Sequence, residues 1–358
     1  MGLSNISLRN FRCFTSAELE FTPSLNLIYG ENASGKTSLI ESIFLLGRGR
    51  SFRTASLRST VYRGANGFHI NGQVTSFSFS TPMRIGLTQT AGQLQATIGG
   101  ETPTTLAQLS ETLPVQLIDS QAHQLIRGGP RCRRQFLDWG AFHVEPTFFP
   151  AWRRYQRALR QRNALLRNGK SQREITSWDG EIVSQGETLN RLRQQYLVNL
   201  LPTAKSWASQ ALGGLDVSLE YRPGWPENQR LSEALRNAID RDQSSGTTQF
   251  GPHRAEMLIN VDGKAAQGWV SSGQEKVLAG SLLLAQASVY RIITSRSCIL
   301  LLDDLAAELD AYHLARFLDR VDETHAQTYI TAIETLPLIR GRAAKSFHVK
   351  QGKIDAVV

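Results

Sequence analysis

The sequence is poor in cysteine and lacks the apolar segments that mark secreted and membrane proteins. Its 358 residues include three cysteines, Cys13, Cys132 and Cys298, without the close spacing of metal ligands. The N-terminal residues contain no apolar core of a signal peptide, and we expect no later run to be long enough to span a bilayer. These absences exclude a disulfide-stabilised secreted fold and predict a protein of the reducing cytoplasm.

Long heptad runs are also missing, and one segment has few acidic residues. The apolar periodicity does not continue for many heptads, which excludes a long coiled-coil arm. Between Arg127 and Arg173, twelve arginines and lysines stand beside two acids, Asp138 and Glu145, in a chain whose net charge is +9. This one segment therefore carries the basic excess, and a polyanion such as DNA is the expected partner.

What the chain does contain is a phosphate-binding loop between a predicted strand and a predicted helix. The motif GENASGKTS begins at Gly30, after the apolar run LNLIY. Its glycines let consecutive backbone N–H groups curl around phosphates, and the helix that opens at Gly35 adds its positive end. Lys36 is expected to reach the β- and γ-phosphates, and the Thr37 hydroxyl to bind Mg²⁺. An ordinary strand-to-helix turn could share the glycines and the lysine, but the flanking strand and helix favour a nucleotide site. The expected nucleotide contacts here are Gly30, Glu31, Asn32, Ala33, Ser34, Gly35, Lys36, Thr37 and Ser38.

A second anion-binding pattern precedes a long apolar helix expected from Val277 to Ile293. Ser271, Ser272, Gly273 and Gln274 combine a hydroxyl with free backbone N–H groups at a helix start. An ordinary helix N-cap has the same pattern, so this segment gains its meaning from the motif that follows it.

That motif is an apolar strand that ends in two carboxylates, Asp303 and Asp304. Asp303 at the strand end can hold the Mg²⁺ shared with Thr37, and Asp304 can orient or deprotonate an attacking water. Gln116, in a strand expected at 114–118, is either a polar residue at a strand end or a sensor of the metal.

The basic segment is predicted to form a helical lobe inserted in an α/β protein. A helix from Pro150 carries arginines on one face, and a second helix from Ile175 to Leu212, broken or kinked at Pro202, is expected to pack antiparallel to it. A charged stripe is often only a solvated face, but the single sign favours contact with a phosphate backbone. The arginines expected at DNA are Arg131, Arg133, Arg134, Arg153, Arg157, Arg160 and Arg167. The expected division is 1–125 and 214–358 for the α/β head, with 126–213 as the basic helical lobe.

The order of these motifs resembles the ABC-type ATPase heads, including the SMC proteins. Within that class the chain resembles the RecF family from end to end. The family's phosphate-loop pattern is met at Gly30, Asn32, Ser34, Gly35, Lys36 and Thr37. The further blocks that carry the resemblance are LRNFR at 8–12, GRSFR at 49–53, RRQFLDWG at 133–140, QRNALLR at 161–167, GPHR at 251–254 and DDLAAELD at 303–310.

The resemblance implies an ABC-type head, with a mixed sheet that holds the phosphate loop, a small antiparallel sheet and the inserted helical lobe. It implies ATP and Mg²⁺ as cofactors and DNA as partner, at gaps and single-strand to double-strand junctions. It also implies an ATP-dependent head-to-head homodimer that works with RecR and RecO to load RecA. Ser271 and Gly273 of one subunit then complete the ATP site of the other, and Gln116 takes the position of the metal-sensing glutamine.

Two departures from the wider class point to slow hydrolysis. Asp304 stands where ABC heads generally carry Glu, and Thr331 stands where many carry a switch histidine. Three alternatives remain: an ATPase subunit of a transporter, which has no use for the basic segment; a chromosome-organising SMC protein, which needs long heptad arms; and a DNA-bound recruitment platform with structural ATP. The role of His253 in the GPHR turn is open between an ordinary turn residue and a ligand or interface residue.

Overall fold

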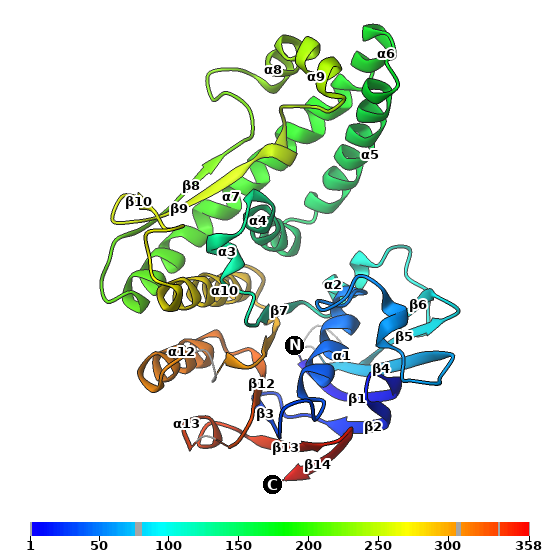
Figure 1. Ribbon diagram of the computed structural model, residues 1–358, viewed down its shortest axis with the longest axis vertical. Coiled ribbons are helices and arrows are strands. Elements are labelled where there is room, and N and C mark those ends of the chain that lie inside the picture. The colour runs from blue at the N-terminus through cyan, green and yellow to red at the C-terminus, as the bar shows by residue number, and fades with distance from the viewer. Residues whose placement is uncertain (1, 76–80, 306–308, 336, 358) are drawn as a thin grey trace. The chain divides into compact units, whose positions relative to one another are not determined.

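The computed structural model describes residues 2–75, 81–305, 309–335 and 337–357 (Figure 1). The chain divides into two compact units: unit 1 comprises Met1–Ala122 and Tyr290–Val358, and unit 2 comprises His123–Val289. The second unit thus extends well past residue 213, the expected end of the helical lobe. Residues 214–289 stay with it because strand β8 (Val217–Arg222) packs on helix α7 (Asp179–Ala211), and β9 (Glu256–Val261) packs on α4 (Pro130–Val144).

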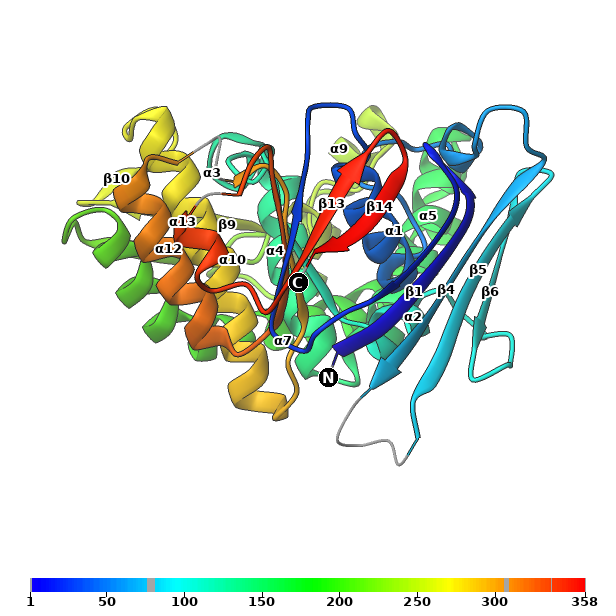
Figure 2. The same ribbon diagram turned by 90° about the horizontal axis from the view of Figure 1, so that it is seen from below.

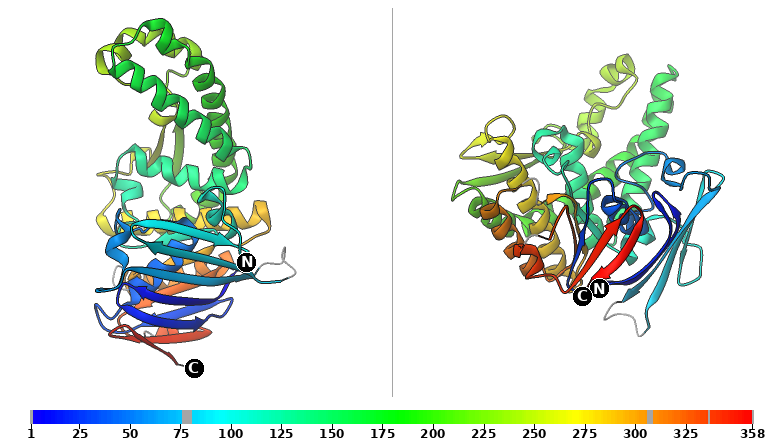
Figure 3. Two further views of the ribbon diagram at one scale, coloured as in Figure 1. Left: turned by 90° about the vertical axis from the view of Figure 1, so that its right-hand side faces the viewer. Right: turned by 60° about the horizontal axis from the view of Figure 1, so that its bottom comes forward.

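Unit 1 contains a five-stranded antiparallel sheet with strand order β2-β1-β4-β5-β6 (Figure 3, left). Its strands alternate between buried and exposed side chains, as in β4, because one face packs on the core and the other faces solvent. The strands are β1 (Gly2–Phe11), β2 (Phe14–Glu20), β4 (Gly67–Thr75), β5 (Met83–Thr90) and β6 (Gln93–Ile98).

The second sheet of unit 1 has six strands in the order β14-β13-β3-β12-β11-β7 (Figure 1). The pairs from β13 to β7 are parallel, and β14 adds an antiparallel edge. All four residues of β11 and all six of β12 are buried, the pattern of strands covered on both faces. The strands are β3 (Leu25–Tyr29), β7 (Val115–Ile118), β11 (Ile299–Leu302), β12 (Gln327–Ala332), β13 (Lys345–Lys350) and β14 (Lys353–Val357).

Helix α1 (Lys36–Arg48) lies between the two sheets and contacts strands of both. Its buried side chains, among them Leu39, Ile43 and Leu46, join a core cluster with residues of β1, β4 and β12. The start of α1 is therefore held firmly at the end of β3. The other helices of unit 1 are α2 (Ala107–Thr112), α12 (Ala311–Thr324) and α13 (Pro337–Arg340), with a 3₁₀ turn at Leu57–Thr60.

Unit 2 is built around two long helices, α5 (Phe148–Arg167) and α7, which pack side by side and run in opposite directions (Figure 1). α7 continues through Pro202 without the expected break. A three-stranded sheet, β10-β9-β8, completes the unit. The remaining elements are α3 (Gln124–Arg127), α6 (Gln172–Thr176), α8 (Leu231–Asn237), α9 (Ile239–Ser245), a 3₁₀ turn at Pro252–Arg254 and β10 (Lys264–Ala265).

The helix α10 (Ser272–Thr294) corrects one expectation from the sequence. Among the described residues it is long enough and apolar enough to cross a membrane, judged by length and composition alone. However, 67% of its 18-residue apolar stretch is buried inside the protein. Core helices of soluble proteins have the same length and composition, so α10 is weak evidence for a membrane.

Candidate functional site

The phosphate loop has the backbone that its glycines permit. Gly30 has φ +152° and Gly35 has φ +123°, conformations that side chains rarely adopt, and a Cβ on Gly30 would lie 2.2 Å from the Val349 carbonyl oxygen. The Lys36 ammonium donates to the carbonyl oxygens of Gly30 at 2.8 Å and Glu31 at 2.9 Å. The lysine therefore lies folded over the loop, where it can meet an incoming phosphate. Along the loop the exposed residues are Glu31, Asn32 and Ala33, and the buried ones are Gly30, Ser34, Lys36 and Ser38.

The end of β11 brings Asp303 to this loop. The Thr37 hydroxyl donates to Asp303 Oδ1 at 3.2 Å, although the two residues are 266 positions apart. Strand β12 lies between β3 and β11, so the carboxyl ends of all three strands meet at one edge of the sheet. The hydroxyl and the carboxylate expected to share Mg²⁺ are thus adjacent.

Thr331 is a member of the site whose role the sequence left open. Its hydroxyl donates to Asp303 Oδ1 at 2.8 Å and accepts the Asp304 backbone N–H at 2.8 Å. It lies near the end of β12, where an ABC-type switch histidine was considered. The signal available in the sequence was a threonine at the end of a buried strand, but only the strand order shows which carboxylates it faces.

Asp303 is a buried residue, with 7% of its surface exposed. Burial raises its pKa to about 6; the hydrogen bond from Thr331 opposes this shift, and the charges of Asp304 and Asp119 add to it. A buried carboxylate that is costly to ionise suits a site completed by a cation. No group of three or more His, Cys, Asp or Glu side chains within the described ranges could hold a metal alone. Mg²⁺ fits here with two protein ligands, because it commonly takes its remaining ligands from water and nucleotide phosphates.

Asp304 follows with φ +54°, a left-handed conformation that is uncommon for a side chain other than Asn or Asp. The bond from its N–H to Thr331 holds this conformation. Its carboxylate is partly exposed, whereas that of Asp303 is buried, so the two neighbours have different surroundings.

Gln116 is not where a metal-sensing glutamine was expected. It pairs with Leu300 inside β7, and its side chain therefore points to the sheet face shared with Leu302 rather than to that of Asp303. The strand continues to Ile118, whose carbonyl accepts the Asp303 N–H at 3.0 Å. Gln116 is 6% exposed, and its Oε1 has no hydrogen-bond partner. The residue at the sheet edge is Asp119, close enough to raise the pKa of Asp303.

The segment from Ser271 to Gln274 forms a reciprocal cap at the start of α10. The Gln274 N–H donates to Ser271 Oγ at 3.3 Å, and the Ser271 N–H donates to Gln274 Oε1 at 2.9 Å. Ser271, Ser272 and Gly273 are exposed. The Ser271 hydroxyl keeps its own hydrogen to donate, so the cap does not prevent it from binding an anion.

The arginines expected at DNA fall into two groups. Arg133 is only 8% exposed and binds both oxygens of Glu256, at 2.7 and 2.8 Å, which gives it an internal role and speaks against the expected contact with DNA. Arg134 is half-buried and donates to the Ala255 carbonyl; burial lowers its pKa. The exposed group consists of Arg131 on α4 and of Arg153, Arg157, Arg160 and Arg167 on α5.

Part of the positive charge of the basic segment is neutralised in the fold by acids that lie outside the segment. Acids from other elements pair with four of its cations: Glu275 with Arg127, Glu256 with Arg133, Glu181 with Arg154, and both Asp179 and Asp242 with Arg162. Arg162 is fully buried and ties α5 to α7 and α9. The exposed arginines of α5 are therefore presented on a firmly anchored helix.

His253 has a structural role. Its Nε2 lies 3.0 Å from the Thr248 carbonyl oxygen, which can only accept, so Nε2 carries the hydrogen and Nδ1 accepts the Tyr155 hydroxyl at 2.6 Å. Burial lowers the His253 pKa to about 4, which keeps the ring neutral at physiological pH. The GPHR turn is thereby fastened to α5.

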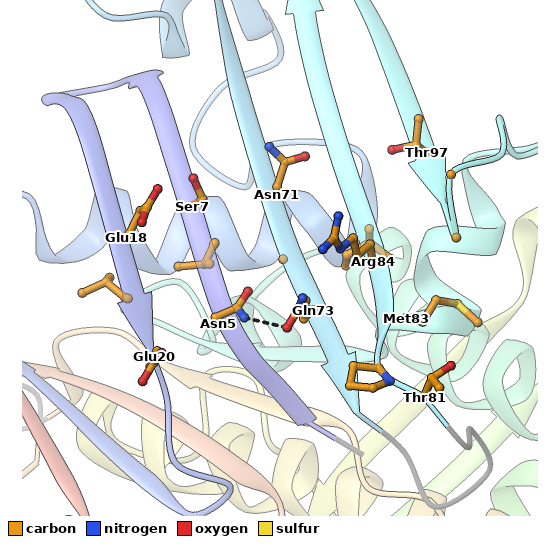
Figure 4. Close-up of a pocket in the computed structure, with 17 residues that line it drawn as sticks. Asn5, Ser7, Glu18, Glu20, Asn71, Gln73, Thr81, Met83, Arg84 and Thr97 are labelled. Carbon is orange, nitrogen blue, oxygen red and sulfur yellow. Dashed lines mark hydrogen bonds between the residues drawn. The ribbon is translucent and has the colours of Figure 1, made fainter.

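A hollow of about 1590 Å³ lies elsewhere, on the solvent face of the five-stranded sheet (Figure 4). Its lining is polar, with an Asn5–Gln73 hydrogen bond of 2.8 Å and the carboxylates of Glu18 and Glu20. None of its lining residues belongs to the phosphate loop or to the Asp303 edge.

Comparison with known proteins agrees with this geometry. The family model described as RecF/RecN/SMC N terminal domain matches residues 2–354. A protein named DNA replication and repair protein RecF from Shewanella baltica is 36% identical over 365 residues, covering 100% of both chains. Its namesake from Vibrio cholerae is 34% identical over 361 residues and 99% of both chains.

Solved structures share the fold. One, described as the recombination mediator protein RecF with ATP in the RecFOR pathway, superposes with a TM-score of 0.90 at 24% identity, covering 99% of this chain and 97% of that one. An SMC head bound to a domain of ScpA superposes with a TM-score of 0.63 at 14% identity, covering 99% and 96%. The fold is that of an ABC/SMC-type ATPase head. By its full-length identity to curated relatives, the chain belongs to the RecF family of DNA replication and repair proteins.

Proposed function

We propose that this protein is an ATP-dependent DNA-binding ATPase of recombinational repair, in which ATP binding drives dimerisation on DNA and slow hydrolysis resets it. The observation that carries the proposal is the meeting of Lys36, Thr37 and Asp303 at one sheet edge, with Thr37 and Asp303 3.2 Å apart. These are the positive charge, the hydroxyl and the carboxylate that phosphoryl-transfer sites need.

In this mechanism the loop N–H groups and Lys36 would bind the phosphates, and Thr37 and Asp303 would hold Mg²⁺. When bound, Mg²⁺ neutralises charge on the phosphate oxygens. The Thr331 hydroxyl fixes both aspartates: it donates to the Asp303 carboxylate and accepts from the Asp304 backbone N–H. Asp304 then orients the attacking water or takes its proton. Its side chain is one methylene shorter than that of glutamate, which favours slow turnover rather than a fast motor cycle. DNA binding is proposed to stimulate this turnover.

Dimerisation and DNA binding are assigned to unit 2. The exposed Ser271 and Gly273 would complete the ATP site of a second copy, which makes the dimer dependent on ATP. Arg131, Arg153, Arg157, Arg160 and Arg167 would contact the phosphate backbone, because they are exposed and share one sign of charge. Gln116, Arg133 and Arg134 are left out of this assignment for the reasons given above.

The names of the relatives support the proposed cellular setting. Their names place them in DNA replication and repair, and solved members of the fold are described within the RecFOR pathway. We assign to this chain the same setting: a cytoplasmic protein that binds gapped DNA and works with RecR and RecO to promote RecA loading.

The test is the molar mass in solution with and without ATP and Mg²⁺, with a gapped duplex as a second variable. A doubling of the mass of 39.8 kDa that needs ATP and is enhanced by DNA is expected. A monomer under all four conditions would contradict the proposed dimer switch and reduce Ser271–Gln274 to a helix cap.

A further inference from the structure

The hairpin formed by β13 and β14 (Figure 2) contacts the phosphate loop through its turn. Its turn runs from Lys350 to Lys353, with Gln351 at φ +47° and Gly352 at φ +76°, as in the tight turns that suit the twist of a hairpin. The Gly352 N–H donates to the Ser34 carbonyl oxygen at 3.1 Å. A backbone group far along the chain thus binds the loop itself.

This hydrogen bond determines which way a neighbouring N–H points. In a planar trans peptide the C=O and the following N–H point in opposite directions. The Ser34 carbonyl turns outward to Gly352, so the N–H of Gly35 points to the inner side of the loop. That N–H stands at the start of α1, where an anion is favoured. The carbonyls of Gly30 and Glu31 are held in a similar manner by Lys36.

Close packing fixes the same arrangement. A Cβ on Gly30 would lie 2.2 Å from the Val349 carbonyl oxygen, and a Cβ on Gly352 would lie 2.4 Å from the Cys13 carbonyl oxygen. A Cβ on Gly35 would lie 2.7 Å from Cys13 Sγ. The phosphate loop therefore approaches β13 through Gly30 and the turn between β1 and β2 through Gly35. The turn between β13 and β14 approaches the turn between β1 and β2 through Gly352, and at two of these three contacts the neighbouring atom belongs to the backbone.

We propose that the Gln351-Gly352 turn is a positioning element of the nucleotide site: its hydrogen bond to Ser34 presents the Gly35 N–H to the phosphates and so sets the affinity for ATP. The proposal rests on the proposed function only in taking the loop's ligand to be ATP. Neither turn residue touches the nucleotide. The turn acts through Ser34. Without the hydrogen bond to Ser34, ATP binding weakens because the Gly35 N–H, although still present, no longer points at the phosphates.

The chain offers a matched control for this turn. The β9–β10 hairpin has the same geometry, with Asp262 at φ +49° and Gly263 at φ +73°, but a Cβ on Gly263 meets nothing within 4 Å. Gly352→Ala and Gly263→Ala impose the same backbone strain, and only the first drives a Cβ into a neighbouring carbonyl. Gly352→Asn and Gly263→Asn repeat the comparison with a residue that tolerates positive φ.

The experiment measures the Kd of a fluorescent ATP analogue, the KM and kcat of hydrolysis, and the Tm of all four variants and the wild type. We expect both Gly352 variants to raise Kd and KM at least about tenfold, the scale of one lost hydrogen bond to a charged group, with kcat changed less. The Gly263 variants should keep the wild-type Kd and share the loss of Tm caused by strain. Kd values unchanged in the Gly352 variants, or raised equally in both pairs, would overturn the proposal.

Hydrogen exchange of the wild-type protein gives a second test that needs no variant. Adding the analogue should slow exchange in the segment 350–353 together with the loop 30–38, because the two share the Ser34 bond. Protection of the loop alone would contradict the coupling. A wild-type protein that binds no analogue at all would instead contradict the proposed function, so the two failures are distinguishable.

Discussion

Replacing Asp303 by asparagine should stabilise the protein in the absence of nucleotide while it disables the nucleotide site. Asp303 is 7% exposed, and its carboxylate accepts hydrogen bonds from Thr37 and Thr331. An asparagine Oδ1 can accept both bonds in the same position. The substitution therefore removes a buried negative charge and keeps the shape and the hydrogen bonds.

The magnitude follows from the raised pKa. A carboxyl with pKa about 6 in the folded protein and 3.8 in the unfolded chain contributes stability that is full below pH 3.8 and is lost as pH rises through 6. At about 1.4 kcal/mol per unit, ionising Asp303 costs the fold about 3 kcal/mol at pH 8 and about half of that at pH 5. Asp303→Asn avoids this cost, so the variant should unfold roughly 3–6 °C higher at pH 8.

Thermal unfolding between pH 5 and pH 8, with and without Mg²⁺ and ATP, measures both effects. The wild type should gain Tm from Mg²⁺ with ATP at pH 8, and the variant should gain little, because its amide is a poor ligand for Mg²⁺. Asp355→Asn, at an exposed position of the same unit, is the control and should change little. A variant less stable than the wild type at pH 8, or a difference independent of pH, would refute the reasoning.

Three further predictions concern the phosphates, the water and the DNA. Lys36→Ala should abolish ATP-driven dimerisation measured by light scattering, with Lys205→Ala as an exposed control, and a variant that still dimerises with ATP would remove the lysine from the site. Asp304→Asn should slow ATP turnover at least about 100-fold and prolong the life of the ATP dimer; full repair activity in cells despite that loss would favour the recruitment platform. Reversing Arg153 and Arg157 to Glu should weaken DNA binding and lower its salt dependence by about 0.9 per lost phosphate contact. The same charge change at Arg191 and Arg236, also exposed in unit 2, should act less, and equal effects would point to net charge alone.

Local patterns made much of the site predictable. The phosphate loop, the cap at Ser271 and the strand before Asp303 each depend on residues close in sequence, and the structure has a loop, a cap and a strand there. The partners of the arginines were not predictable, because the acids Glu256, Glu275 and Glu181 come from other elements and single-segment charge counts omit them.

Strand order and register were the other missing information. Gln116 lies in the expected strand, but its pairing with Leu300 turns it away from Asp303. Thr331 could be linked to Asp303 only once β12 was known to lie beside β11. The extent of unit 2 to Val289 likewise depends on contacts of β8 and β9 with helices far from them in sequence.

The strand order also has a consequence for synthesis of the protein on the ribosome. β3, which leads into the phosphate loop, is made early, but its two neighbours in the sheet are β12 and β13, which emerge after residue 326. Until then β3 has no lateral partner, and Asp303 and Gly352 are also still to come. At about 5–20 residues per second, a nascent chain spends roughly 15–60 s with its nucleotide motif exposed and incomplete. Chains truncated by premature termination should therefore be unable to bind nucleotide. Such fragments should not accumulate on DNA as ATP-bound dimers.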